Sequence, residues 1–317
     1  MAGSGNTADA EAKSVDSVAA HIDLVQTAPG GAATCVRTVV FAGIRLAEID
    51  LGAPHIVFLS PPKDSVVFIF SFTSLPGSVW NGAAVRHDTV LMSSGSSLHL
   101  RTSAARRWGI VAIARPVLAG HARALLGTEL ETSEASFLRP PPVALGDIRR
   151  VLGQACRLGA AKPRLLARRG VACALEQDLV RALICGLEAA TACTGLSVNR
   201  RHVGNMVRFE RALAKHSRGD TSLPALCREI GVSARTLQNC CDAFLGCSPI
   251  AYASLRRLNR ARTLLAMADP AEASVAAIAA HCGFKQPGRF ALTYRNVFGE
   301  RPSQTLSRPL ATSADPA

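Results

Sequence analysis

The sequence predicts an α+β protein, in which a small antiparallel β-barrel or sandwich with helices precedes an all-α domain containing two helix-turn-helix units. Three observations predict this fold. Short β-branched and aromatic-rich segments, separated by Gly, Pro or Ser, follow one another over about 35–115. The apolar spacing becomes helical after Pro116. From about 200 onward the pattern is entirely helical, and one helix–glycine–helix segment occurs twice.

These patterns divide the chain into four parts. We expect a disordered tail and lead-in over 1–32, a β-rich sensor or dimerisation domain with C-terminal helices over 33–195, a helical domain over 200–310, and a tail over 311–317. The first residues contain no apolar segment typical of a signal peptide. No apolar run approaches the ~18 residues that a membrane span needs. We therefore expect a cytoplasmic protein.

Composition limits the classes of partner. The 317 residues are 48% apolar, enough for a sizeable core, and carry a net charge of +13 with a pI of about 9.9. This charge favours an acidic partner, and nucleic acid is preferred to a membrane surface. The ten cysteines include no Cys-x-x-Cys pair, so we expect no zinc site and no other metal. Free thiols in this number are typical of a reducing compartment.

Two local patterns stand out in the β-rich part. Trp80-Asn81-Gly82 lies between apolar residues, and Asn-Gly is a strong signal for a two-residue hairpin turn. Further along, 174–190 reads as an amphipathic helix with leucines on one side. We expect that stripe to form a dimer seam through Leu175, Leu179 and Leu183.

The duplicated segment covers 222–249 and 274–302. In both copies a serine precedes a short helix, a glycine ends it, and a second helix carries apolar residues at i, i+4, i+7 and i+8. The two apolar sets are related by an offset of 53: Leu237, Cys241, Phe244 and Leu245 against Phe290, Tyr294, Val297 and Phe298. Each copy therefore predicts a helix-turn-helix unit.

The segment between the copies explains why two are present. Residues 248–269 begin with Ser-Pro, a helix start, and continue with a leucine stripe. One long helix there would hold the units rigidly apart. The second helix of each unit could then enter one of two successive major grooves, ~34 Å apart on one face of DNA.

Over roughly 205–308 the sequence resembles the AraC/XylS family of bacterial transcription regulators. The resemblance is carried by ALCREIGVSARTLQ, LGCSPIAY, RRLNRARTLL, VAAIAAHCGF and RFALTYRNVFGERPS, in the order and spacing typical of the family. It implies that the exposed start of each second helix reads bases. The base-reading candidates that it implies are Arg235, Thr236, Gln238, Asn239, Arg289 and Leu292. The phosphate-contact candidates are Ser233, Arg257, Lys285, Arg295 and Arg301.

The chemistry of these side chains fits that role. Arginine can take guanine in a bidentate contact, and glutamine or asparagine can take adenine. Each of them could also belong to a solvated helix face, and only the duplication makes that alternative weaker. Cys241 stands where the family usually has phenylalanine, and Pro287-Gly288 weakens the start of the second reading helix. We therefore expect the first unit to carry most of the sequence specificity.

The resemblance also implies partners for the whole chain. They are double-stranded DNA, RNA polymerase, a second copy of the chain and an unknown small-molecule effector held in a pocket of the β-rich domain. A surplus of buried-type residues among the strands also favours an effector there: Phe68, Phe70, Phe72, Trp80 and Leu91. We expect an effector-responsive activator without a cofactor. No converging pair of titratable groups indicates an enzyme. The alternative is a small-molecule-binding or enzymatic β-barrel protein whose helical half binds DNA only non-specifically. A basic run at 149–169 is either a solvated surface or an extra contact to DNA or polymerase.

Overall fold

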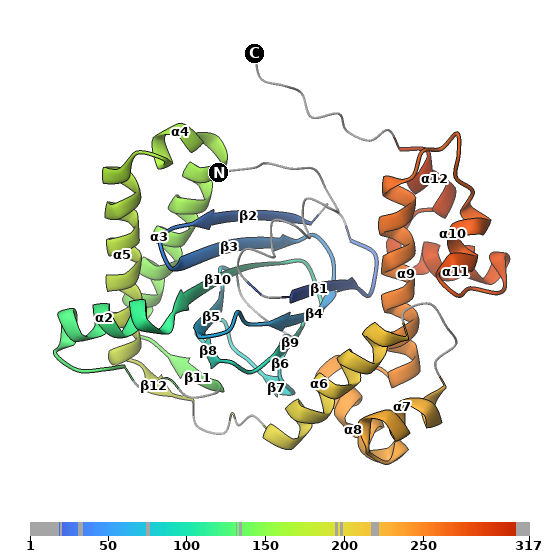
Figure 1. Cartoon of the computed structure of the whole chain (residues 1–317), viewed down its shortest axis with the longest axis horizontal. Coiled ribbons are helices and arrows are strands. Elements are labelled where there is room, and N and C mark those ends of the chain that lie inside the picture. Colours follow the sequence, from blue (N-terminus) through green and yellow to red (C-terminus); the bar gives the residue numbers. More distant parts are fainter. Residues whose placement is uncertain are drawn as a thin grey trace.

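The computed structural model describes residues 19, 21–30, 34–73, 77–130, 132, 135–193, 196, 199–216 and 222–308. Within them the chain forms two antiparallel sheets and eleven helices (Figure 1). The α+β prediction is confirmed. The described strands form a two-sheet sandwich and no closed barrel. The predicted tail over 311–317 and most of the predicted lead-in lie outside the described residues.

The smaller sheet has five strands. Their order is β1 (His21–Gln26), β4 (His55–Ser60), β9 (Leu98–Arg101), β6 (Val79–Trp80) and β7 (Ala83–Ala84). Strand β1 lies inside the segment that we expected to be a tail and lead-in, so that expectation was wrong for these residues. The signal was present in HIDLVQ, where polar and apolar residues alternate as in a half-buried strand.

The larger sheet has seven strands. Their order is β12 (Thr191–Ala192), β11 (Ala135–Arg139), β8 (Val90–Ser94), β5 (Ser65–Ser71), β10 (Arg106–Ala114), β3 (Ile44–Leu51) and β2 (Cys35–Val40). Strand β10 is central, with Ile110 opposite Ala47 on one side and Ile69 on the other. Both of its faces are covered, which explains why its sequence reads as a continuous apolar run.

The predicted hairpin is confirmed. Strands β6 and β7 pair through Trp80 and Ala83, leaving Asn81 and Gly82 as a two-residue loop. Both loop residues have positive φ, 46° and 83°, as a type I′ turn requires. Asparagine and glycine tolerate this conformation best, so the dipeptide determines the turn.

Strand β5 shows how the layers are arranged. Val67 and Ile69 point toward the five-stranded sheet, where they join the core between the sheets. Phe68 and Phe70 point the other way, into a core shared with the helices. Between the sheets, Trp80 and Trp108 are buried with their ring centroids 5.3 Å apart. The sandwich interior is therefore filled by large side chains.

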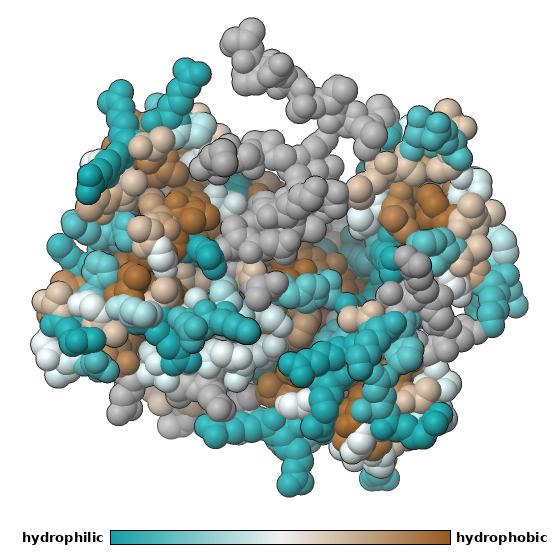
Figure 2. Space-filling view, in the orientation of Figure 1, coloured by the Kyte–Doolittle hydropathy of each residue, from teal (hydrophilic) through white to brown (hydrophobic). Residues whose placement is uncertain are grey.

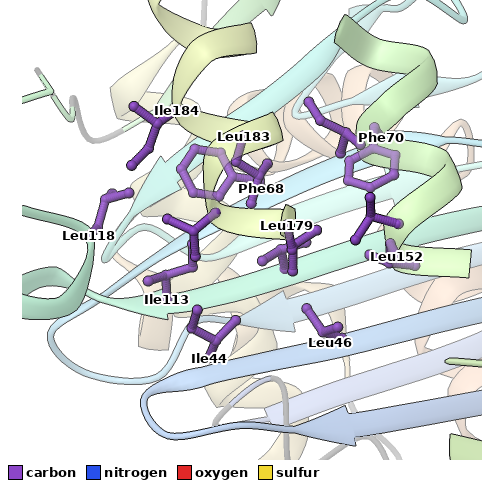
Figure 3. Close-up of a cluster of buried hydrophobic side chains, with 14 of the residues drawn as sticks. Ile44, Leu46, Phe68, Phe70, Ile113, Leu118, Leu152, Leu179, Leu183 and Ile184 are labelled. Carbon is purple, nitrogen blue, oxygen red and sulfur yellow. The ribbon is translucent and has the colours of Figure 1, made fainter. Parts of the chain in front are cut away.

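Four helices border the seven-stranded sheet: α2 (Arg115–Leu126), α3 (Pro142–Ala161), α4 (Pro163–Leu166) and α5 (Arg169–Glu188). Leu118, Leu152 and Ile184 reach from three of them toward Phe68 and Phe70 (Figure 3). None of the helices in the described ranges is long and apolar enough to cross a membrane.

The expected dimer seam is wrong. Leu175, Leu179 and Leu183 are only 8%, 0% and 0% exposed, because this side of α5 packs against α3 and the sheet within one chain. A second copy could reach these leucines only if α5 left the core. Amphipathicity identified the buried side of the helix correctly, but it could not tell whether the cover came from the same chain or from another.

The C-terminal helices form two groups on either side of one long helix, α9 (Pro249–Met267), as Figure 1 shows. The first group contains α6 (Arg200–Lys215), α7 (Leu223–Ile230) and α8 (Ala234–Leu245). The second contains α10 (Val275–His281), α11 (Pro287–Phe298) and α12 (Pro302–Leu306). Each group has a core of its own, and Leu255 of α9 borders both.

Candidate nucleic-acid interface

The first helix-turn-helix unit consists of α7 and α8. The Ser222 side chain accepts a hydrogen bond from the backbone N–H of Ala225, which fixes the start of α7. Gly231 ends α7 with a φ of 75°, and its N–H donates to the Cys227 carbonyl at 2.9 Å. Ser233 then caps α8 by accepting from the N–H of Thr236 at 3.1 Å. The turn is thus short and held at both ends.

Helix α8 presents the predicted base-reading residues on one side. Arg235, Gln238 and Asn239 occupy positions i, i+3 and i+4, which share one helix face. Arg235 and Asn239 are exposed, while Thr236 and Gln238 are half-buried. The Gln238 amide is already engaged, because its Nε2 donates to Asp242 Oδ1 at 2.9 Å. Asp242 was missed at the sequence level, although its i+4 spacing from Gln238 could have revealed it.

The opposite side of α8 is fully buried. Cys240 and Cys241 are 0% exposed, and Phe244 beside them is 2% exposed. Burial raises the pKa of both thiols, so they remain protonated and pack as small apolar groups. The core tolerates Cys241 in place of an aromatic ring because Phe244 fills the adjacent space, where its ring lies 5.8 Å from that of His99.

The second unit consists of α10 and α11. Ser274 caps α10, and its oxygen accepts from the N–H of Ala277 at 3.1 Å. Gln286 precedes α11 without a side-chain cap, and Pro287 and Gly288 form its first turn. Arg289 is exposed, and Leu292 is 62% exposed on the same face. The first two turns of this face therefore carry one charged group and one apolar group, on a helix with a weaker start than α8.

Asn296 belongs to the same face of α11, two turns from Arg289, and is exposed. Asn296 was not among the predicted site residues. Its spacing of seven from Arg289 was the available signal. Thr293, between them, donates its hydroxyl to the Arg289 carbonyl at 2.9 Å and is thereby bound to its own helix.

The predicted phosphate contacts occupy different positions around these helices. Lys285, Arg295 and Arg301 are exposed at the edges of the second unit. Arg257, on α9, is half-buried, and its guanidinium lies 5.4 Å from the ring centroid of Phe284. Ser233 is exposed, but its hydroxyl is occupied by capping α8. The structure thus brings four of the five candidates to the second unit or α9.

Comparison with known proteins shows which class of domain this region contains. Residues 226–308 match the model of a helix-turn-helix domain. This region is of the AraC/XylS type. It is similar to a probable thc operon regulatory protein of Rhodococcus erythropolis, 37% identical over 94 residues, or 30% of this chain and 28% of the relative. It is also similar to a XylDLEGF operon transcriptional activator of Pseudomonas putida, 35% identical over 101 residues, or 31% of this chain and 32% of the relative.

The region is also similar in sequence to a protein of solved structure. The chain is 34% identical to a probable AraC family transcriptional regulator from Rhodopseudomonas palustris CGA009, covering 33% of this chain and 95% of that one, with a TM-score of 0.31. The chain spans about a third of the length of the curated relatives named above.

The AraC/XylS-type domain is bonded to the five-stranded sheet through a buried carboxylate. Glu210 of α6 is 3% exposed and lies 2.9 Å from His99 Nε2 on β9. It also accepts from the Tyr252 hydroxyl at 2.8 Å and forms an ion pair with Arg256. Arg256 in turn pairs with Asp23 of β1. This seam network, defined as Asp23, His99, Glu210, Tyr252 and Arg256, joins two strands to two helices.

Amide and backbone groups extend the contact along α9. Asn259 accepts from the backbone N–H of Gln26 at 2.9 Å and donates to its carbonyl at 3.0 Å. The Gln26 amide donates to the Val297 carbonyl of α11 at 3.4 Å, so β1 also reaches the second unit. At the other unit, a Cβ on Gly82 would lie 3.1 Å from the Phe244 ring. The sheet therefore fixes where both units lie.

The basic run at 149–169 belongs to α3, α4 and the start of α5. Arg149 is structural, since its guanidinium donates to the carbonyls of Ser71 and His87 at 2.7 and 2.6 Å. Arg150 pairs with Asp147. The other five cations are exposed: Arg157, Lys162, Arg164, Arg168 and Arg169. No group of three or more metal-binding side chains converges within the described residues.

Proposed function

We propose that the chain is a sequence-specific DNA-binding transcription regulator, an effector-responsive activator that reads two successive major-groove segments. One observation carries the proposal. Two helices, α8 and α11, expose arginine-bearing faces near their N-terminal ends, and one continuous helix, α9, holds them apart. Its 19 residues give a length of about 28 Å, which is comparable to one turn of DNA.

The exposed side chains match what bases offer in the major groove. Arg235 and Arg289 present guanidinium groups to guanine, and Asn239 presents an amide to adenine. Gln238 presents an amide of which one N–H is already used, so its oxygen is the free acceptor. Leu292, 62% exposed, offers an apolar contact for a thymine methyl group. Lys285, Arg295, Arg301 and Arg257 would position the backbone phosphates.

The first unit is proposed to supply most of the specificity. Helix α8 has three polar groups on its reading face and a side-chain cap at Ser233. Helix α11 has no side-chain cap and carries Gly288 in its first turn, which lowers helix stability by up to ~1 kcal/mol relative to alanine. A less firmly formed reading helix discriminates less between bases.

The remaining parts of the proposal concern the whole chain. The β-rich part would sense a small molecule, and the regulator would act on RNA polymerase as a homodimer in the cytoplasm. The similarity to named transcriptional activators supports activation. The dimer contact lies on a surface other than the leucines of α5. A β-rich enzyme with a non-specific helical half is the competing function.

The test is selection of bound duplexes from a random pool by the purified chain. We expect two short elements about ten base pairs apart to be enriched. Arg235→Ala should relax one element at a cost of ~1–3 kcal/mol, and Arg289→Ala the other at a smaller cost. Arg211→Ala, which removes an exposed arginine of α6, is the matched control and should leave both preferences intact.

Only one result contradicts the proposal outright. If the chain binds all duplexes alike, with a steep dependence on salt, the basic charge is sufficient to explain binding. The helices α8 and α11 would then not be reading heads, and the competing function would become the better one.

A further inference from the structure

The interior of the sandwich is an unsuitable place for an effector. The side chains expected to line a pocket there, Phe68, Phe70, Trp80 and Leu91, are 0% exposed and packed into the two cores of the β-rich part. A cavity of about 280 Å³ lies instead at the junction of β1, α6 and α9. It approaches the lower end of the size of small-molecule sites. This junction cavity is bounded by the sheet on one side and by the AraC/XylS-type domain on the other.

The polar lining of the junction cavity is cationic. Arg256, Arg257 and Arg260 all contribute to it, whereas Asp23 is the one carboxylate among its lining residues. His216 also lines the cavity, with its Nε2 2.8 Å from Glu229 Oε2. Asp23 is already paired with Arg256 and with His21, and these partners lower its pKa despite its burial. Arg260 forms no ion pair with a carboxylate of the described chain. Arg260 therefore brings to the cavity a positive charge for which the described residues supply no counter-ion.

The rest of the lining is apolar. Leu24 and Val25 come from β1, Leu213 from α6 and Ala253 from α9. Val25, Leu213 and Ala253 are less than 10% exposed. A ligand that fits both parts has an anionic group next to Arg260 and an apolar body of about ten non-hydrogen atoms. A fully polar ion would leave this apolar wall in contact with water.

We propose that the junction cavity binds a small organic anion, whose carboxylate or phosphate pairs with Arg260 while its apolar part rests on Leu24 and Leu213. The proposal specifies the class of effector in the proposed function. It rests on that function for the regulatory step alone, whereas binding of the anion does not depend on it. Ion pairing of a guanidinium with an anion inside a partly enclosed cavity is stronger than on the open surface.

The position of the junction cavity couples the ligand to DNA reading. Its walls are β1, which belongs to the sheet, and α9, which positions both helix-turn-helix units. The same two elements are held together by Arg256 with Asp23 and by Asn259 with Gln26. A ligand that contacts both walls binds one relative position of β1 and α9 better than others, so it shifts the population toward that position.

The test uses the full chain without DNA and three matched probes: 3-phenylpropanoate, its neutral amide, and phenyl phosphate. Thermal shift and titration calorimetry should show saturable binding of the two anions, with the amide at least about tenfold weaker. Arg260→Gln should weaken both anions by a similar factor. Arg211→Gln, the control on the outer side of α6, should change nothing. Thr263→Trp, which fills the cavity from α9, should abolish binding.

Failure of the anion site can be distinguished from failure of the proposed DNA-binding function. Equal affinity for acid and amide, an unchanged affinity in Arg260→Gln, or no saturable binding of either anion at millimolar concentration overturns the anion site. DNA affinity is then measured with and without 3-phenylpropanoate. An anion site that leaves DNA affinity unchanged removes the coupling step. Failure of the duplex selection with intact anion binding would overturn the proposed DNA function and leave the site standing.

Discussion

The two helix-turn-helix units share a sequence pattern but differ in what completes their cores. The core of the first unit includes Val25 of β1 and Ile56 of β4, so the sheet supplies part of it. The core of the second unit is closed by α9 and α12 and contains a chain of aromatic rings: Phe284, Phe290, Tyr294 and Phe298, with successive centroids 4.9, 5.6 and 4.5 Å apart.

This difference shows that a local pattern and its coupling to the rest of the molecule are separate properties. The repeat determines that each unit forms a short helix, a turn and a second helix. The residues that surround the repeat decide whether the unit shares a core with the sheet. A state of the sheet can therefore reach the first unit through packing, whereas it reaches the second mainly through α9 and the Gln26 contact.

The largest expected effects come from removing one buried phenylalanine from each unit. These substitutions test whether the first unit depends on the sheet more than the second does. Phe244→Ala and Phe290→Ala should each lower the free energy of unfolding by roughly 3–5 kcal/mol, because both rings are buried. Both tryptophans lie in the sandwich, so their emission follows the sheet while circular dichroism at 222 nm follows the helices. Phe290→Ala should separate the two melting curves, and Phe244→Ala should shift them together.

Leu292→Ala is the control for these melts. Its side chain is 62% exposed, so the free energy of unfolding should change by less than ~0.5 kcal/mol. Coincident melting curves in Phe290→Ala would show that the second unit depends on the sheet as much as the first does.

The seam network can be disrupted without changing the apolar core of either unit. Glu210→Ala leaves Arg256 and His99 without their shared carboxylate in a buried position. We expect a loss of roughly 3–4 kcal/mol in the free energy of unfolding. Glu229→Ala, which removes exposed pairs with Lys215 and His216, should lower the free energy of unfolding far less. Urea unfolding followed by both probes measures the difference; equal small losses would show that the network contributes little.

Acid should weaken the sheet at its boundary with α9. His55 on β4 is 4% exposed, and burial lowers its pKa from 6.5 to about 4. Between these values the unfolded chain binds the proton and the folded chain does not. The free energy of unfolding therefore falls as the pH drops from 6.5 toward 4, by a total of roughly 2–3 kcal/mol.

His55→Gln tests this assignment, because glutamine can donate a hydrogen bond as the His55 ring does toward Ala53. The variant should show a flatter dependence of unfolding free energy on pH across that window. His21→Gln is the comparison. The pKa of His21 is raised by Asp23, so its contribution is present below pH 6.5 and is lost as the pH rises through its folded value. If the slope between pH 6.5 and 4 is the same in His55→Gln, another group causes it.

The smallest expected effect concerns the hydrogen bond that orients the Gln238 side chain on α8. Asp242→Ala frees the second N–H of the Gln238 amide, which the folded chain directs to Asp242. Helix stability should change by about 0.2–0.5 kcal/mol, the value of such an i,i+4 pair. Competition binding with duplexes altered at one position should show broader base preference. Asp242→Asn keeps an acceptor and should retain the original preference; if both variants behave alike, the bond does not orient the amide.

The parts of the fold that were predicted correctly are those determined by neighbouring residues. The Asn81-Gly82 turn, the serine caps and the glycine ends of the short helices each depend on local backbone chemistry. The apolar spacing also located both second helices, α8 and α11. None of these features needs information from a distant part of the chain.

The missed features depend on distant contacts. Leu179 was placed on a dimer surface because amphipathicity identifies a buried side but not the element that covers it. Strand β1 was taken for a lead-in, since its partner β4 begins 34 residues after it does. Glu210 and His99 are 111 positions apart, and nothing in either local sequence connects them. The junction cavity is formed by three such separated segments.

The close approach of the β6–β7 hairpin tip to α8 predicts that two distant positions of the chain change together in evolution. Gly82 has a φ of 83°, and the Phe244 ring of α8 occupies the space into which a side chain would extend. Any larger residue at the tip would push the reading helix away from the sheet unless the ring at 244 became smaller. The two positions, 162 residues apart, should therefore change together among close homologues, and a chimera that exchanges only one domain between them should bind its operator with altered spacing.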